Sequence, residues 1–275
     1  MRNLSTLAWR VYDAPTKPWH GVVADTEGDD SVYVMRVERR DGVSQLTLAH
    51  ITPTGTEELA VLEVASAPPH VPDIADFRLL ADGGSSVNHM PAICVIGSGG
   101  DIVLMPVDEE ASAPAEVVGS VDQGILAAAW SPEEDVLVLI TGGEKRLIVM
   151  TREFEVMSET MLSTEAFGDD QPVNVGWGSK STQFHGSEGK QAAMAAANAP
   201  EESDPRGPLV PEDDGLPRIS WRGDGAFFVT SSAEASHDTV HRILRTYTRT
   251  GTLSATSDRS VRGISHVLAC RPTGN

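Results

Sequence analysis

The sequence has few cysteines, no long hydrophobic run and little helical periodicity. Only two of its 275 residues are cysteine, Cys94 and Cys270, too few for a disulfide scaffold, so we expect two free thiols in a reducing compartment. No run of 18 or more apolar residues occurs, and the first residues lack the apolar stretch of a secretory signal. The sequence therefore predicts a cytoplasmic protein, and the expectation also allows a nuclear pool beside the cytoplasmic one.

Basic residues are scarce relative to acidic ones. The chain has 21 Lys and Arg against 40 Asp and Glu, a formal net charge of −19. A surface of this sign repels nucleic-acid phosphates and anionic lipids. We therefore expect this chain alone to bind RNA poorly and not to bind membranes.

Short β-rich runs take the place of helical patterns, and turn residues separate them. The runs span 31–37, 45–51, 91–97, 101–107, 135–142, 146–151, 226–232 and 242–250. Gly-containing pairs such as Asp41-Gly42 and Asp224-Gly225 lie between runs, as hairpins require. The chain is predicted to be all-β.

Bulky side chains recur at a nearly constant interval. Each lies at the end of a strand-like run and before a turn: Trp130, Trp177, Trp221 and Cys270, with spacings of 47, 44 and 49 residues. A strand-and-turn period of 40–50 residues is typical of β-propeller blades, each of four short strands. We interpret residues 1–275 as the N-terminal part of a WD40-like β-propeller, incomplete at about four to five blades. The bulky side chains are predicted to anchor one blade on the next.

Residues 190–217 interrupt the repeat. The segment is Ala-rich, then acidic and Pro-rich, a composition with little to bury. We expect a flexible insertion loop within the propeller. The acidic group Glu212–Asp214 inside it, and similar groups elsewhere, lack the spacing of calcium ligands and are expected to be solvated.

The run HGSEGK at 185–190 has some features of a phosphate-binding loop but fails at diagnostic positions. Phe184 stands where that motif needs its first glycine, and Gln191 stands where it needs a hydroxyl. His185 likewise breaks the nucleophile-elbow pattern. We expect no catalytic or cofactor-binding residue here. The remaining hypothesis is a partner-contact loop formed by Phe184, His185, Gly186, Ser187, Glu188 and Lys190.

Two other motifs also favour structural explanations. HDTVH at 237–241 resembles a zinc motif, but Asp238 replaces its glutamate and the β-branched residues lead into a strand rather than a helix. WRGDG at 221–225 fits a tight hairpin turn. We therefore predict no metal site.

Longer runs of the sequence resemble a known family. AFGDDQPVNVGWGSKSTQFHGSEGKQAA, PRISWRGDGAFFVTSS, GDIVLM, GSVDQGILAAAWSP, TREFE and the opening MRNL are similar to the largest, scaffold subunit of the Elongator complex. The similarity is strong over 97–275 and weak over 5–95. Cys270 departs from the pattern, since a Trp is usual there, and the chain ends at Asn275, before the first propeller closes.

The resemblance implies an N-terminal WD40 propeller in a non-catalytic scaffold subunit. In that family the assembled complex modifies the wobble uridine of certain tRNAs, and a different subunit with a radical iron–sulfur and acetyltransferase module carries the chemistry. The implied partners are that catalytic subunit and a second propeller subunit, with tRNA reached only through the complex. The family's dimerisation region is absent from this chain.

Two alternatives of other classes remain. One is a WD40-type adaptor of another cytoplasmic assembly, against which the QFHGSEGK and SWRGDG strings count. The other is a propeller-based hydrolase, which would need converging acids, histidines or a metal that the repeats do not supply in register.

Overall fold

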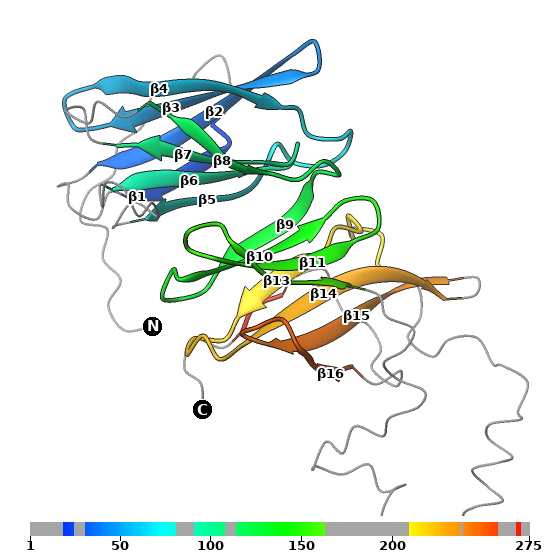
Figure 1. The fold of residues 1–275 in the computed structure, drawn as a ribbon. Coiled ribbons are helices and arrows are strands. Elements are labelled where there is room, and N and C mark those ends of the chain that lie inside the picture. The colour runs from blue at the N-terminus through cyan, green and yellow to red at the C-terminus, as the bar shows by residue number, and fades with distance from the viewer. Residues whose placement is uncertain are drawn as a thin grey trace, which may run out of the picture. The chain divides into compact units, whose positions relative to one another are not determined.

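The chain folds entirely into β-sheets where its structure is described. The computed structural model describes residues 19–24, 31–80, 91–107, 114–162, 209–236, 239–257 and 268–270. Within these ranges sixteen strands form four antiparallel sheets of four strands each, and no helix occurs (Figure 1). These ranges accordingly contain no helix of the length and apolarity that crossing a membrane requires. The predicted fold class, all-β with an incomplete β-propeller, is confirmed.

The first compact unit comprises residues 1–67 and 72–118 and holds two sheets. The strands of one, in spatial order, are β1 (Gly21–Ala24), β2 (Val32–Arg40), β3 (Val43–Ile51) and β4 (Thr56–Ala65). The other contains β5 (Ile74–Leu80), β6 (Ala92–Gly97), β7 (Asp101–Pro106) and β8 (Glu116–Ser120), whose last two residues fall in the second unit.

One apolar core joins the two sheets of this unit. Alternate side chains of β2 and β3 pack with alternate side chains of β6 and β7: Tyr33, Met35, Val37, Leu46, Leu48, Ile93, Val95, Val103 and Met105. The period of two places all of them on facing sides of the sheets. Face-to-face packing of successive sheets is the arrangement that a propeller requires.

The turn between β6 and β7 lies tight against the end of β4. Asp101 Oδ2 accepts a 2.7 Å hydrogen bond from the backbone N–H of Ala65, and a Cβ built on Gly99 would lie 1.9 Å from the carbonyl oxygen of Ala65. We expect Gly99→Ala to lower the free energy of unfolding by about 1–3 kcal/mol, because the turn must move away from β4. Urea denaturation measures the effect. The control Gly55→Ala meets no atom within 4 Å, and an equal loss in both variants would contradict the prediction.

Asp76 on β5 carries a carboxyl group that the fold holds partly out of water. Burial raises its pKa from 3.8 to about 6, against the lowering effects of the Phe77 backbone N–H and the Arg78 charge. The folded state therefore binds more protons than the unfolded chain between these two values, and this group's contribution to stability is lost as the pH rises through 6.

Asp76→Asn should therefore stabilise the chain at pH 7. We expect a gain of about 1 kcal/mol, discounted for partial solvent exposure, because the amide keeps the hydrogen-bond acceptor and removes the charge. Thermal unfolding from pH 3.5 to 8 measures the difference, which should vanish below about pH 4. A constant difference across the range would show that the charge is not its cause.

The second unit comprises residues 68–71 and 119–275 and also holds two sheets. The first contains β9 (Ile125–Trp130), β10 (Val136–Thr141), β11 (Arg146–Thr151) and β12 (Val156–Met161). The second contains β13 (Arg218–Trp221), β14 (Phe227–Ser236), β15 (Thr239–Thr248) and β16 (Leu253–Thr256). The hairpin of β14 and β15 is much longer than either strand beside it.

An aromatic stack lies at the centre of this unit's core. Phe228 is 0% exposed and lies between Trp221 and Tyr247, with ring centroids 4.9 and 5.3 Å away. The same cluster includes apolar side chains of the neighbouring sheet, among them Val138 and Val149. The two sheets therefore share one core, as those of the first unit do.

The predicted hairpin turns are confirmed. Asp41 and Gly42 both have positive φ, 48° and 86°, and join β2 to β3 in the two-residue turn that such pairs favour. Gly225, at a φ of 65°, lies in the turn between β13 and β14, where its N–H donates to the carbonyl of Arg222 over 2.9 Å.

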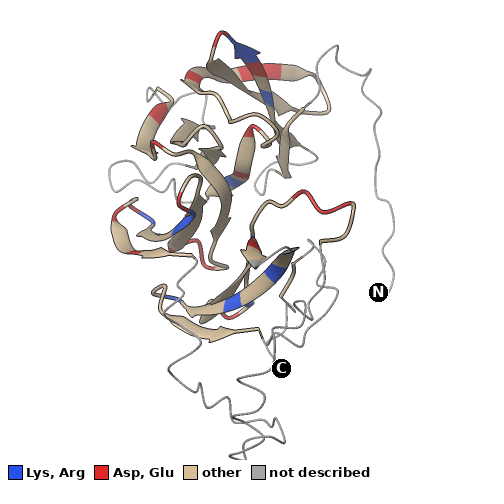
Figure 2. Cartoon of the chain, turned by 90° about the vertical axis from the view of Figure 1, so that its right-hand side faces the viewer, with Lys and Arg blue, Asp and Glu red and all other residues tan. Residues whose placement is uncertain are grey.

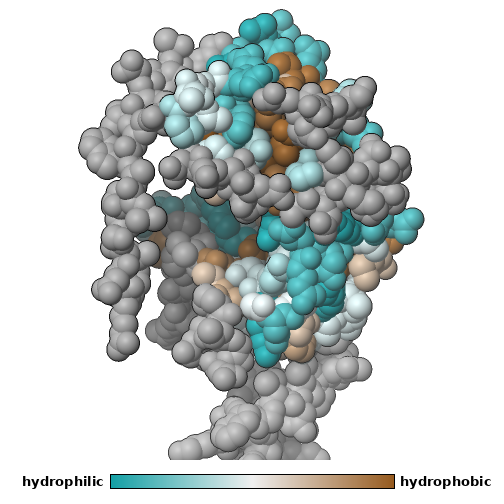
Figure 3. Space-filling model, turned by 90° about the vertical axis from the view of Figure 1, so that its left-hand side faces the viewer, coloured by the Kyte–Doolittle hydropathy of each residue, from teal (hydrophilic) through white to brown (hydrophobic). Residues whose placement is uncertain are grey.

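In the view of Figure 3 the described surface is mostly hydrophilic, with apolar areas between the hydrophilic ones.

Candidate functional site

The two described tryptophans of the repeat lie at the ends of the first strands of their sheets. Trp130 ends β9, is 4% exposed and meets Phe154 edge to face at 6.0 Å. Trp221 ends β13, and its Nε1 donates a 3.2 Å hydrogen bond to the carbonyl oxygen of Ala129 on β9. Because β13 touches β9 directly, Trp130 and Trp221 stand on neighbouring sheets.

Cys270 makes a similar contact with β13, the strand that ends at Trp221. Its Sγ donates to the carbonyl oxygen of Ser220 at 3.4 Å, and its backbone N–H donates to Ser220 Oγ at 2.8 Å. Trp221 binds the carbonyl just before Trp130, and Cys270 binds the carbonyl just before Trp221. Cys270 therefore occupies on β13 the place that Trp221 occupies on β9.

The role of Trp177 as a blade anchor stays a prediction, because Trp177 lies outside the described residues. So does the predicted partner-contact loop, Phe184, His185, Gly186, Ser187, Glu188 and Lys190.

The structure does show where the chain leaves and rejoins the described sheets around residues 163–208. Before this stretch, the N–H of Leu162 donates to the carbonyl of Lys145 at 2.9 Å; after it, the N–H of Leu209 donates to the carbonyl of Val240 at 3.0 Å. The Lys145 Nζ also donates to the carbonyl of Ala233 at 3.1 Å. Lys145 thus links the departure point to the β14–β15 hairpin, on which the chain returns.

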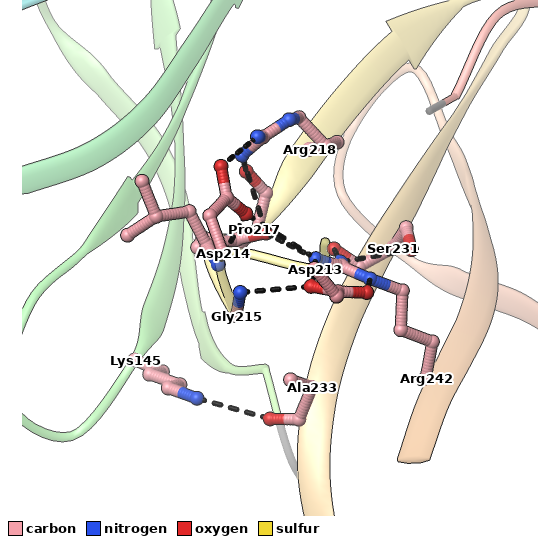
Figure 4. A network of polar contacts seen from close by, with 10 residues as sticks. Lys145, Asp213, Asp214, Gly215, Pro217, Arg218, Ser231, Ala233 and Arg242 are labelled. Carbon is pink, nitrogen blue, oxygen red and sulfur yellow. Dashed lines mark hydrogen bonds and ion pairs between the residues drawn. The ribbon is translucent and has the colours of Figure 1, made fainter. Parts of the chain in front are cut away.

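A buried ion pair holds the returning segment, residues 209–217, against this hairpin (Figure 4). Arg242 on β15 donates from Nε and Nη2 to the two carboxylate oxygens of Asp213, each at 2.6 Å, and both side chains are 0% exposed. Arg242 also donates to the carbonyl of Leu216 at 3.0 Å. Two parallel bonds between a guanidinium and a carboxylate are strong and fix the geometry.

This pair corrects one expectation. The acidic group Glu212–Asp214 was expected to be solvated, and that is wrong for Asp213, because its charge pairs with an arginine inside the fold. Asp214, by contrast, is 42% exposed and pairs with the partly exposed Arg218. Residues 209–217, the last part of the predicted flexible insertion, are therefore anchored to β15.

A second ion pair lies on the other side of the same hairpin. Arg245 on β15 binds both carboxylate oxygens of Glu234 on β14. Burial would raise the pKa of Glu234, but the Arg245 hydrogen bonds and charge outweigh it and hold the pKa below its usual value. Ser232 adds a further hydrogen bond to Glu234, at 3.0 Å. The carboxylate therefore stays ionised and paired.

The buried carboxylates of this region are engaged in ion pairs. Asp213 is bound by Arg242 and Glu234 by Arg245. No group of three or more His, Cys, Asp or Glu in the described ranges could hold a metal ion. The region anchors both ends of the stretch that contains the predicted partner-contact loop.

Comparisons with known proteins agree on one family. The family described as ELP1 first N-terminal beta-propeller matches residues 1–275. Elongator complex protein 1 of Mus musculus is 32% identical over 286 residues, covering 100% of this chain and 19% of its own length. The Drosophila melanogaster and Schizosaccharomyces pombe proteins of the same name are 40% and 37% identical, each over 67% of this chain and 14% of their own length.

The chain thus spans about a fifth or less of these relatives. The four-stranded sheets and the sequence comparisons both indicate a β-propeller. The chain belongs to the family of the first N-terminal β-propeller of Elongator complex protein 1.

Proposed function

We propose that this chain is the N-terminal propeller region of a non-catalytic scaffold subunit of the Elongator complex. In this role it supports wobble-uridine modification of tRNA, and hence translation, through contacts with other subunits in the cytoplasm. The observation that carries the proposal is the family match over the whole chain. The partners are the radical iron–sulfur and acetyltransferase subunit and a second propeller subunit.

The described side chains support a binding rather than a catalytic role. The buried polar groups of the second unit mainly hold strands and sheets together. Arg249, for example, reaches from the β15–β16 turn to Asp135 on the neighbouring sheet and to the carbonyl of Gly225. Rigid sheets joined in this way present loops in fixed positions, which is how scaffolds bind partners.

Co-purification of the full-length parent protein tests the proposal. We expect an affinity-tagged parent to bring down both the iron–sulfur subunit and the second propeller subunit, and we expect its loss to reduce wobble-uridine modification. Cell fractionation should place it in the cytoplasm. A parent that purifies alone and hydrolyses a small substrate would overturn the proposal in favour of a propeller-based enzyme. Recovery with a different cytoplasmic assembly would make it an adaptor of that assembly.

The isolated chain should bind tRNA weakly or not at all. Its net charge is −19, and in the view of Figure 2 acidic and basic positions are interspersed along the described strands and turns. Because acidic residues outnumber basic ones by 40 to 21, the chain as a whole repels phosphates and little counterion release is available to drive binding. Electrophoretic mobility shifts at 50 and 200 mM salt measure the affinity. Sub-micromolar binding that weakens steeply with salt would contradict the prediction.

A further inference from the structure

The last strand of the β9–β12 sheet has an open edge within the part of the chain that the structure describes. β12 (Val156–Met161) pairs with β11 on one side, and no described strand lies on the other. It is also unusually apolar for an exposed strand, because Val156, Met157 and Met161 are 60%, 46% and 40% exposed. An exposed strand edge is a template for another strand, and proteins usually protect it with Pro, Lys or a covering element.

The register shows which backbone groups face outward. The N–H of Leu162 donates inward to Lys145 on the β11 side, and Thr160 and Ser158 lie opposite Leu147 and Val149 in the same ladder. Because hydrogen-bonding direction alternates along an antiparallel strand, the N–H and C=O groups of Glu159 and Met161 point to the open edge.

The two faces of β12 differ. Ser158 points toward the β13–β16 sheet, where its Oγ donates to the carbonyl of Thr250 at 2.8 Å. Glu159 and Met161 therefore lie on the opposite face, and the exposed Met157 stands at a β-bulge, where the register with β11 shifts. Methionine side chains adapt to varied apolar partners and are common at binding surfaces.

Acidic residues flank this edge. Glu153 and Glu155, in the turn before β12, are exposed, and Glu159 lies on the strand itself, paired with Arg146 at 2.7 Å. A second copy of the chain would bring the same acidic groups together across the edge, and each copy carries a net charge of −19. Like charges at close range oppose such pairing.

We propose that the β12 edge docks an extended segment of a partner protein, which adds as a fifth strand. The segment has β-branched or other apolar residues at alternate positions and Lys or Arg residues opposite Glu153 and Glu155. Backbone hydrogen bonds to Glu159 and Met161 give affinity, and the exposed methionines and the acidic flank give selectivity. The inference rests on the proposed scaffold function for its biological setting.

Fluorescence anisotropy with the 275-residue chain tests the proposal. The probe is a labelled peptide, Lys-Val-Thr-Val-Lys-Val-Thr-Val. The variants are Glu159→Pro and Glu159→Thr, which both lose the Arg146 pair, whereas only proline removes the outward N–H. We expect Glu159→Pro to weaken binding at least tenfold relative to Glu159→Thr. Equal affinity of the two variants would overturn the proposal.

Two modified versions of the probe peptide, here called peptide twins, test the proposal without any change to the protein, in case the proline variant does not fold. A twin with N-methyl groups on alternate amides should bind at least tenfold more weakly, because it cannot complete the ladder. A twin with Glu in place of Lys should also bind at least tenfold more weakly at low salt, and the difference should shrink in 1 M salt. Equal binding by either twin would overturn the proposal.

Sedimentation of the chain alone separates the partner from a second copy. We expect a monomer over the tested concentrations. A dimer that Glu159→Pro dissolves would assign the edge to self-association and overturn the proposal. Failure of the peptide test would leave co-purification of the parent with other subunits unaffected, so the two proposals fail separately.

Discussion

Replacing Asp213 with asparagine should lower the free energy of unfolding by about 3 kcal/mol or more. The substitution removes the buried charge that balances the guanidinium of Arg242, since both side chains are 0% exposed, and leaves it only the partly exposed carboxylate of Asp214 at 3.6 Å. Breaking a buried ion pair by removing one partner is costly because the remaining charge stays out of water. Urea denaturation of the chain, followed by tryptophan fluorescence, measures the loss.

Asp214→Asn is the matched control. It removes the neighbouring carboxylate, which is 42% exposed, pairs with Arg218 and lies 3.6 Å from Arg242; because water screens this exposed group, its loss should cost less than about 1 kcal/mol. Replacing both buried partners, Asp213→Leu with Arg242→Met, should recover much of the stability lost by Asp213→Asn. If the single variant at 213 is no less stable than the control, the ion pair does not anchor this segment.

Phe228→Ala should be similarly destabilising, by about 3–5 kcal/mol. Phe228 lies between Trp221 and Tyr247 at the junction of two sheets, so its removal opens a cavity that rigid sheets cannot fill. The separation of the sheets should also expose tryptophan, so both the unfolding midpoint and the native fluorescence report the change.

Phe228→Leu separates the loss of the ring from the loss of volume. Leucine fills most of the space and should cost about half as much or less. Trp221→Phe provides a second comparison, because it keeps the packing but loses the hydrogen bond to Ala129, with an expected cost of about 1 kcal/mol. Equal stability of the Phe228→Ala variant and the parent chain would mean that the two sheets do not depend on a shared core.

The eight β-rich runs predicted from the sequence are the two central strands of each sheet: β2, β3, β6, β7, β10, β11, β14 and β15. The strand-like runs that end in Trp130 and Trp221 correspond to β9 and β13. Central strands are covered on both faces, so they read as continuous apolar runs, as β6 and β10 do with every residue buried. The sequence signal is strongest where burial is most complete.

The outer strands were missed for the same reason. β12 (VMSETM) is almost wholly exposed, and β4 (TEELAVLEVA) mixes charged and apolar residues. Neither has a clean alternation, because one edge and part of each face meet solvent. Such strands are specified by their neighbours rather than by their own composition.

The Arg242–Asp213 pair was not predicted because its members lie far apart in sequence within segments of opposite character. Asp213 belongs to an acidic, Pro-rich stretch that is typical of solvated loops. Arg242 gives the only local signal, since it begins an otherwise strand-like run, and a buried arginine requires a partner. Composition cannot say which of 40 acidic residues that partner is.

The anchors on either side of residues 163–208 have an evolutionary consequence. The chain departs beside Lys145 and is held again at Arg242, and Lys145 itself binds Ala233, which lies directly opposite Arg242 in the sheet. The entropy of closing a loop grows only with the logarithm of its length, so doubling the residues between fixed ends costs only about 0.6 kcal/mol. Relatives can therefore gain or lose residues between these two points while the sheets beneath keep their register.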